Sequence, residues 1–126
     1  WVVKVIAALR DPRGLDLLEH ALQADIAPSV RRSATRGLAD LELSEDAAHD
    51  QLERCFKGLL RAVQDDEWVV RYAAAYGLEQ RLNSAAVSAH LAEQGRAALN
   101  QLASDAEGVR VVQLRALKAL QRLNAG

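Results

Sequence analysis

The stretch VVRYAAAYGL at residues 69–78 decides the fold class, because two further stretches of the chain match it. They are SVRRSATRGL at residues 29–38 and GVRVVQLRAL at residues 108–117. Their Val-Arg pairs lie 40 and then 39 residues apart, and each arginine is followed six positions later by a small residue and then by leucine. Self-similarity at this period predicts helix pairs that stack on one another to bury a continuous core.

The composition favours helices over strands. The 126 residues include 24 Ala and 20 Leu but only one Thr and two Ile, whereas strands prefer β-branched and aromatic residues. Apolar residues recur at helical spacing, so each repeat is expected to be an outer helix, a short acidic turn and an inner helix. The expected outer helices cover residues 13–23, 45–63 and 85–103, the inner helices cover residues 29–41, 68–82 and 107–123, and residues 1–9 are expected to be the remainder of an earlier inner helix. We therefore predict one all-α domain over residues 1–126, a right-handed solenoid of about three HEAT-like helix pairs and a fragment of a longer array.

Capping signals mark the expected helix starts. Asp11 is followed by Pro12, which fits an N-cap with proline in the first helical position. Ser44 and Ser84 are predicted to cap the next two outer helices. The stretch Ser104-Asp105-Ala106-Glu107 has the pattern of a capping box before the last inner helix.

Small residues are expected where helices approach each other closely. Ala34, Gly37, Ala74 and Gly77 lie on the core side of two inner helices. A glycine inside a helix costs roughly 1 kcal/mol relative to alanine, and close packing is the natural compensation.

Several functional classes are not indicated. The lone cysteine, Cys55, cannot form an internal disulfide and is expected to be a buried, inert thiol. His20, His49 and His90 are not clustered, so no metal site is predicted, and no catalytic constellation is visible. The chain contains no apolar run long enough to span a membrane and no visible signal peptide, and a cytoplasmic location is expected.

Two stretches resemble a known family. Residues 9–18 (LRDPRGLDLL) and 65–78 (DDEWVVRYAAAYGL) are similar to HEAT-like repeats of the phycobilisome (bilin) lyase type found in cyanobacteria. The resemblance implies a scaffold that binds a linear tetrapyrrole transiently, with no permanent cofactor. It also implies a protein partner, either a phycobiliprotein or a second lyase subunit. Members of this family attach bilins, remove them, or act as chaperones.

A helical wheel of the inner helix 68–82 separates a core side from an outward side. Trp68, Tyr72, Tyr76 and Glu79 lie opposite the core position Val70. Aromatic and arginine side chains suit protein hot spots and also a flat conjugated ligand that carries carboxylates. The predicted ligand- or partner-binding residues across the three inner helices are Arg32, Arg36, Trp68, Tyr72, Tyr76 and Arg115. The structural alternative is that the tyrosines only pack between repeats.

The repeated arginines are predicted to be structural. Each lies in the first turn of an inner helix, where its guanidinium can pair with a turn carboxylate of the same or an adjacent repeat. This set consists of Arg31, Arg71 and Arg110 with Asp25, Asp65, Asp66 and Asp105.

Three functions stay open on the sequence. The first is a bilin-lyase-like binding scaffold, and the second is a general protein–protein interaction module without a chromophore. The third is nucleic-acid repair on a basic inner-helix surface, formed by Arg32, Arg36, Arg115, Lys118 and Arg122. The net charge of −1 disfavours the third.

Overall fold

A computed structural model describes residues 1–43, 48–84 and 87–126. Its elements are α1 (Val2–Leu9), the 3₁₀ turn η1 (Pro12–Gly14), α2 (Leu15–Ala24), α3 (Pro28–Asp40), α4 (Ala48–Val63), α5 (Trp68–Leu82), α6 (Ala89–Ala103) and α7 (Arg110–Ala125). No strand occurs in these three ranges.

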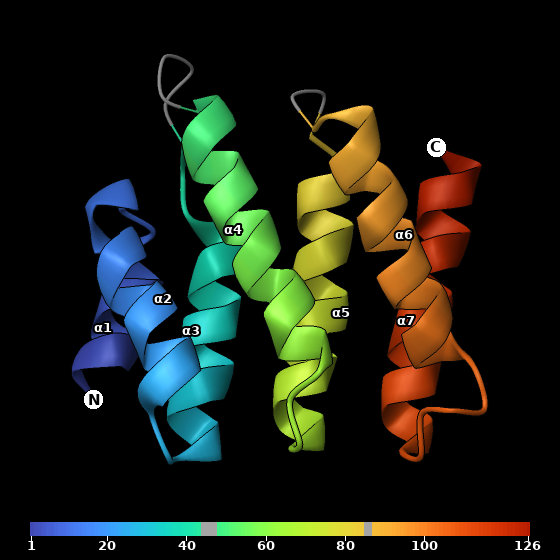
Figure 1. Ribbon diagram of the computed structural model, residues 1–126, viewed down its shortest axis with the longest axis horizontal. Coiled ribbons are helices and arrows are strands. Elements are labelled where there is room, and N and C mark those ends of the chain that lie inside the picture. Colours follow the sequence, from blue (N-terminus) through green and yellow to red (C-terminus); the bar gives the residue numbers. More distant parts are fainter. Residues whose placement is uncertain (44–47, 85–86) are drawn as a thin grey trace.

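The helices form two layers. In Figure 1, α2, α4 and α6 lie in front of α1, α3, α5 and α7, and consecutive helix pairs stand side by side from the N-terminal to the C-terminal end. We call the front row the outer layer and the back row the inner layer. The core lies between them and contains leucines of the outer helices and small residues of the inner helices. The three pairs α2–α3, α4–α5 and α6–α7, preceded by α1, confirm the predicted all-α solenoid.

Most helix boundaries agree with the sequence, and the differences lie at caps. The fifth helix spans residues 68–82 as predicted, and Asp11 accepts a hydrogen bond from the backbone N–H of Arg13 at 2.9 Å, as an N-cap should. The prediction for Ser84 was wrong, because Ser88 caps α6 by accepting from the N–H of Leu91 at 3.2 Å. Ser44, the other predicted cap, lies outside the described residues.

The predicted capping box at residues 104–107 is also wrong. The last inner helix begins at Arg110 rather than 107, and its N-cap residue Val109 makes no side-chain capping bond. The Oγ of Ser104 instead accepts from the N–H of Ala106 at 3.2 Å. Glu107 pairs with Arg71 of the preceding repeat and accepts from the N–H of Val109, so the chain stays non-helical for three more residues.

Glycine at position 77 allows two layers and two repeats to meet. A β-carbon placed there would lie 2.5 Å from Cδ2 of Leu59 in α4 and 3.0 Å from Cβ of Ala39 in α3. Gly37 has the same relation to Leu18 and Ala7 one repeat earlier. The predicted close approach of these helices is therefore confirmed. It places α1, α3 and α5 next to one another, so that side chains of adjacent inner helices can line the same surface hollow.

Candidate functional site

A shallow pocket opens on the inner layer where three helices meet. It has a volume of about 250 Å³ and is lined by Arg32 from α3, Trp68, Val69 and Tyr72 from α5, and Val111 from α7. Trp68 and Val111 are each 44% exposed. Tyr72 is half-buried, with part of its ring against the core. We call these five residues the inner-layer pocket, and it unites three of the predicted binding residues.

Tyr76 and Arg36 pack against each other, and neither of them lines the inner-layer pocket. The guanidinium carbon of Arg36 lies 3.9 Å from the centroid of the Tyr76 ring, a cation–π distance. The Tyr76 hydroxyl donates to a carboxylate oxygen of Asp40 at 2.7 Å. Burial and this bond to Asp40 raise the pKa of Tyr76. The structure therefore supports the packing alternative for Tyr76.

Glu79 was expected on the outward side, and this expectation was wrong. It is only 3% exposed, and its carboxylate accepts from Arg115 at 2.8 Å and from Arg122 at 3.4 Å. The helical wheel assigns Glu79 to the correct side of α5, but α7 packs over this side and buries the carboxylate. The guanidinium of Arg115 therefore forms an ion pair with Glu79. It also lies 5.9 Å from the centroid of the Tyr76 ring.

A second hollow lies between α1 and α3 and shares Arg32 with the inner-layer pocket. Its volume is about 260 Å³, and its charged lining residues are Lys4, Arg32, Arg36 and Asp40. Two alanines, a serine and a glycine form the rest of the wall. Three cations against one carboxylate make this hollow attractive to an anion. Among the described residues Arg32 and Lys4 take part in no ion pair, so their charges face solvent.

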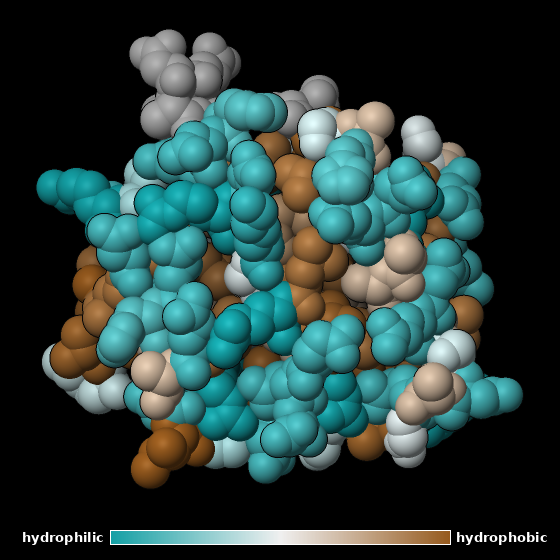
Figure 2. Space-filling model, in the orientation of Figure 1, coloured by the Kyte–Doolittle hydropathy of each residue, from teal (hydrophilic) through white to brown (hydrophobic). Residues whose placement is uncertain are grey.

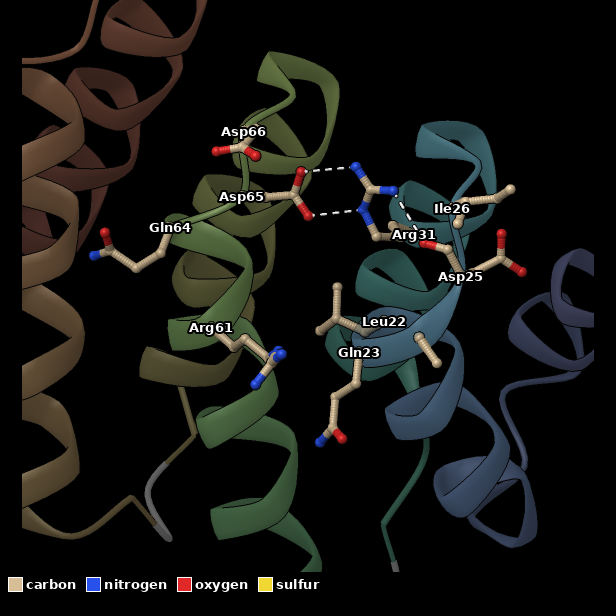
Figure 3. Close-up of a pocket in the computed structure, with 10 residues that line it drawn as sticks. Leu22, Gln23, Asp25, Ile26, Arg31, Arg61, Gln64, Asp65 and Asp66 are labelled. Carbon is tan, nitrogen blue, oxygen red and sulfur yellow. Dashed lines mark hydrogen bonds and ion pairs between the residues drawn. The ribbon is translucent and has the colours of Figure 1, made fainter.

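Two of the three repeated arginines tie their turn to the next one, whereas the third, Arg110, is exposed and its Nη1 donates to the side-chain oxygen of Gln113 in its own helix at 3.1 Å. Arg31 donates to both carboxylate oxygens of Asp65, at 2.9 and 3.1 Å, and to the carbonyl oxygen of Asp25 at 3.0 Å (Figure 3). Arg71 repeats this arrangement with Glu107, at 2.7 and 2.9 Å, and with the carbonyl oxygens of Asp65 and Asp66. We call the two pairs the turn ladder.

The expected partner in the last turn was the wrong residue. Asp105 is exposed and makes no ion pair within the described part of the chain, whereas Glu107 is buried and takes its place. Asp25 and Asp66 contribute their carbonyl oxygens to the arginines, and the Asp25 carboxylate accepts from the N–H of Ala27. Glu107 lies three residues before Arg110 in the sequence, and this position was interpreted as part of a capping box.

The Arg71–Glu107 pair of the turn ladder is expected to stabilise the fold at neutral pH and to lose this contribution in acid. The hydrogen bonds from Arg71 hold the pKa of Glu107 below its usual value. A carboxyl group with a lowered folded-state pKa stabilises the fold above its unfolded pKa, and this contribution disappears as the pH falls through the folded pKa. We expect Glu107→Gln to cost roughly 1–3 kcal/mol at pH 7 and to flatten the loss of stability below about pH 4.5. Urea unfolding between pH 7 and pH 3 measures both effects.

Glu93→Gln is the matched control, because Glu93 is an exposed residue of α6. It should leave the acid dependence unchanged. A Glu107→Gln variant that loses stability with pH as steeply as the unmodified chain would show that the pair does not contribute.

The outer layer and its turns carry hollows of their own, but no aromatic side chain lines them: one of about 300 Å³ lies between α2 and α4, and one of about 680 Å³ lies at the turns beside Arg31 and Asp65. Figure 2 shows mostly hydrophilic side chains over α2, α4 and α6, with hydrophobic residues visible between α4 and α6. Cys55 is buried as expected, and burial raises the pKa of its thiol. Over the described ranges no three His, Cys, Asp or Glu side chains gather as metal ligands. None of the described helices has both the length and the apolar character needed to cross a bilayer.

Comparison with known proteins places the chain in a family, although no family model matches it. It is 54% identical over 123 residues to the "Bilin biosynthesis protein RpcF" of Synechococcus sp. (strain WH8020), covering 98% of this chain and 58% of that protein. It is 40% identical to the "Phycobilisome maturation protein" of Synechococcus elongatus, covering 100% of this chain and 61% of that protein. The chain thus spans about three fifths of the length of these relatives.

A solved structure agrees in fold as well as in sequence. It is the complex of CpcE and CpcF of phycocyanin lyase from Nostoc sp. PCC7120, in which one chain matches with a TM-score of 0.77 and 35% identity. The match covers 94% of this chain and 68% of that one. The chain therefore belongs to the HEAT-like helical-repeat family of bilin lyase subunits.

Proposed function

We propose that the chain is a binding scaffold that holds a bilin chromophore, a phycobiliprotein, or both, while the chromophore is attached, removed or protected. Its relatives are named as a bilin biosynthesis protein, a phycobilisome maturation protein and a phycocyanobilin lyase subunit. A second lyase-type subunit is part of this proposal, because the solved relative is a complex of two subunits. The cytoplasmic location expected from the sequence stays a prediction.

The observation that carries the proposal is the inner-layer pocket. Exposed tryptophan and valine side chains on one face of a small domain mark an interaction site more than a scattered exposed residue would. Trp68 and Tyr72 offer aromatic faces for a conjugated ring system, and Val111 adds an apolar contact. Arg32 adds the cation that a carboxylate-bearing ligand needs.

The neighbouring hollow extends the same surface. Because Arg32 lines both the pocket and the hollow, a ligand with an apolar body and carboxylate arms can place its body over Trp68 and its charges toward Lys4. Arg36 contributes its charge from the Tyr76 ring on which it stacks. Linear tetrapyrroles have this amphipathic chemistry.

The chain's own contribution to bilin transfer is orientation. Its thiol is buried, so the thiol that adds to the bilin is expected on the acceptor protein. Holding two reactants in register can replace a large part of the entropic barrier to their reaction. The ligand is accordingly expected to bind transiently.

The pocket is tested by Trp68→Ala and Arg32→Gln. Both side chains are exposed, so each change should alter the free energy of unfolding by no more than about 0.5 kcal/mol. Loss of Trp68 should weaken binding of phycocyanobilin by about 2 kcal/mol, roughly 30-fold, as expected for an aromatic hot spot. Absorbance and fluorescence titrations with free phycocyanobilin measure this, and Arg32→Gln should also reduce the salt dependence of binding.

Trp1→Ala and Arg61→Gln are matched controls, since both remove an exposed side chain of the same type elsewhere on the molecule. Equal losses in the control and pocket variants would refute the assignment of the pocket.

A protein-interaction module without a chromophore is the second candidate. It is favoured by the same exposed aromatic and arginine residues, which dominate protein interfaces. In that case free phycocyanobilin causes no spectral change, while Trp68→Ala still weakens capture of a phycobiliprotein. The nucleic-acid alternative is weakened by the structure, because Arg115 and Arg122 are paired with Glu79.

A further inference from the structure

One side of α3 carries an ordered series of charges along the hollow between α1 and α3. Arg32, Arg36 and Asp40 all line this hollow, and they follow one another at intervals of four residues. Side chains four residues apart lie on the same side of a helix, about 6 Å apart along its axis. The hollow therefore has two cations in succession and a single carboxylate beyond them, and Lys4 of α1 adds a third cation. Arg32, at the start of the series, also lines the inner-layer pocket.

The carboxylate of Asp40 is held in place from α5. Its Oδ1 accepts the 2.7 Å hydrogen bond from the Tyr76 hydroxyl, and the guanidinium of Arg36 stacks on the same Tyr76 ring. No hydrogen bond or ion pair within the described part of the chain occupies the other oxygen, Oδ2. Because Asp40 is only half-buried, this oxygen can accept a hydrogen bond from a ligand in the hollow.

The two walls of the hollow are tied together at the same end. The Nε of Arg10, which follows α1, donates to the backbone carbonyl oxygen of Asp40 at 3.1 Å. The backbone N–H of Glu42, just beyond α3, donates in turn to the carbonyl oxygen of Arg10 at 3.0 Å. These bonds connect the C-terminal ends of α1 and α3 directly. The position of Asp40 therefore does not depend on the contact with Tyr76 alone.

The order of the charges favours a particular ligand chemistry. A ligand whose carboxylate lies at the far end of the hollow is disfavoured, because Asp40 repels it. A ligand with an N–H group at this end is favoured, because an ionised acceptor forms a stronger hydrogen bond than a neutral one. A linear tetrapyrrole combines these properties: its two carboxylates are on the middle rings, and each terminal ring is a lactam with an N–H group.

We propose that Asp40 is a specificity-determining residue of the hollow and accepts a hydrogen bond from the N–H group of a terminal lactam ring, while the three cations bind the carboxylates of the middle rings. The bilin then lies along α3, with its other terminal ring over the inner-layer pocket. Tyr76 is a positioning residue, since it acts on the ligand only through Asp40 and Arg36. The inference rests on the proposed function, because it assigns an orientation to the bilin within that site.

Asp40→Asn tests the acceptor. The asparagine carbonyl oxygen can keep the hydrogen bond from Tyr76, whereas the amide nitrogen replaces the free Oδ2 and cannot accept from a lactam N–H. Titration of free phycocyanobilin, followed by absorbance, should show an affinity lower by about tenfold or more, as expected for the loss of a hydrogen bond to a charged group. A carboxylate that acted only through its charge would have the opposite effect, because its removal would strengthen binding of an anionic ligand. The unfolding midpoint of the variant should match that of the unmodified chain.

Tyr76→Phe separates positioning from binding. It removes the hydroxyl that donates to Asp40 but keeps the ring on which Arg36 stacks, so the affinity for phycocyanobilin should fall by no more than about threefold. Asp50→Asn is the matched control, because Asp50 is an exposed residue of α4 in the outer layer, and its affinity should be unchanged. The dimethyl ester of phycocyanobilin retains the N–H groups without the charged arms, and Asp40→Asn should weaken its binding by a similar factor.

Two results would overturn this assignment of Asp40 and leave the proposed function intact. The first is an affinity of Asp40→Asn for phycocyanobilin that is unchanged or higher. The second is a loss in Tyr76→Phe as large as the loss in Asp40→Asn, which would show that Asp40 only holds Tyr76 and Arg36 in place. Absence of phycocyanobilin binding to the unmodified chain is a different result, because it would overturn bilin binding itself together with the role of Asp40.

Discussion

We expect Leu59→Ala to lower the free energy of unfolding by roughly 2–5 kcal/mol, because it opens a cavity at the junction of the two layers. Leu59 is completely buried in α4, and its side chain packs against the backbone of α5 at Gly77. Few side chains can move into the vacated space, since α5 also packs closely on α3 here: a β-carbon placed at Gly77 would lie only 3.0 Å from Cβ of Ala39. Urea unfolding at neutral pH gives the change directly.

Leu17→Ala is the matched control. Leu17 is a leucine of the outer layer that is partly exposed, so its truncation should cost well under half as much. Similar costs for the two variants would show that Leu59 does not lie in a close-packed junction.

The contact between Leu59 and Gly77 gives a sharper form of the same test. Gly77→Ala alone should be destabilising, because the added methyl group meets Cδ2 of Leu59 at 2.5 Å. In the Leu59→Ala background that clash is removed, and the methyl group fills part of the cavity. We expect a favourable coupling of roughly 0.5–3 kcal/mol in the double-mutant cycle. Strict additivity would contradict the close approach of α4 and α5.

The sequence predicted the fold well because each repeat carries its own helical periodicity. The apolar spacing of residues 68–82 fixed both ends of α5, and the small residues at 37 and 77 indicated where helices approach. These are local properties that depend on one helix and its immediate packing surface. Cap residues were harder to assign: both Ser84 and Ser88 precede α6, and Ser88 is the cap because α6 begins at Ala89.

The candidate site was predicted only in part because its details depend on contacts between repeats. A helical wheel assigned Tyr72, Tyr76 and Glu79 to one side of α5, which is correct as a direction. It cannot show that α7 covers Glu79 or that the end of α3 supplies Asp40 to Tyr76, since the partners lie 36 residues away in each case. Likewise, the choice between Asp105 and Glu107 depends on the conformation of the turn, since the paired carboxylate lies 34 residues after Arg31 but 36 residues after Arg71.

Removing one partner of such a contact between repeats should lower the free energy of unfolding, and the largest loss is expected at Glu79. We expect Glu79→Ala to destabilise the chain by about 3–5 kcal/mol, because it leaves the guanidinium of Arg115 buried without its counter-charge. The side chains of Glu79 and Arg115 are 4% and 11% exposed, and Nη1 of Arg115 already lacks a hydrogen-bond partner among the described residues. Glu53, which is half-buried and pairs with Lys57 one turn away, is the control, and Glu53→Ala should cost only about 0.3–0.5 kcal/mol. Replacing Glu79 and Arg115 together by methionine should recover most of the lost stability, since a well-packed apolar pair carries no desolvation penalty. A double variant as unstable as Glu79→Ala would mean that the pair stabilises the fold through its geometry, by holding α7 against α5, and not through the balance of its charges.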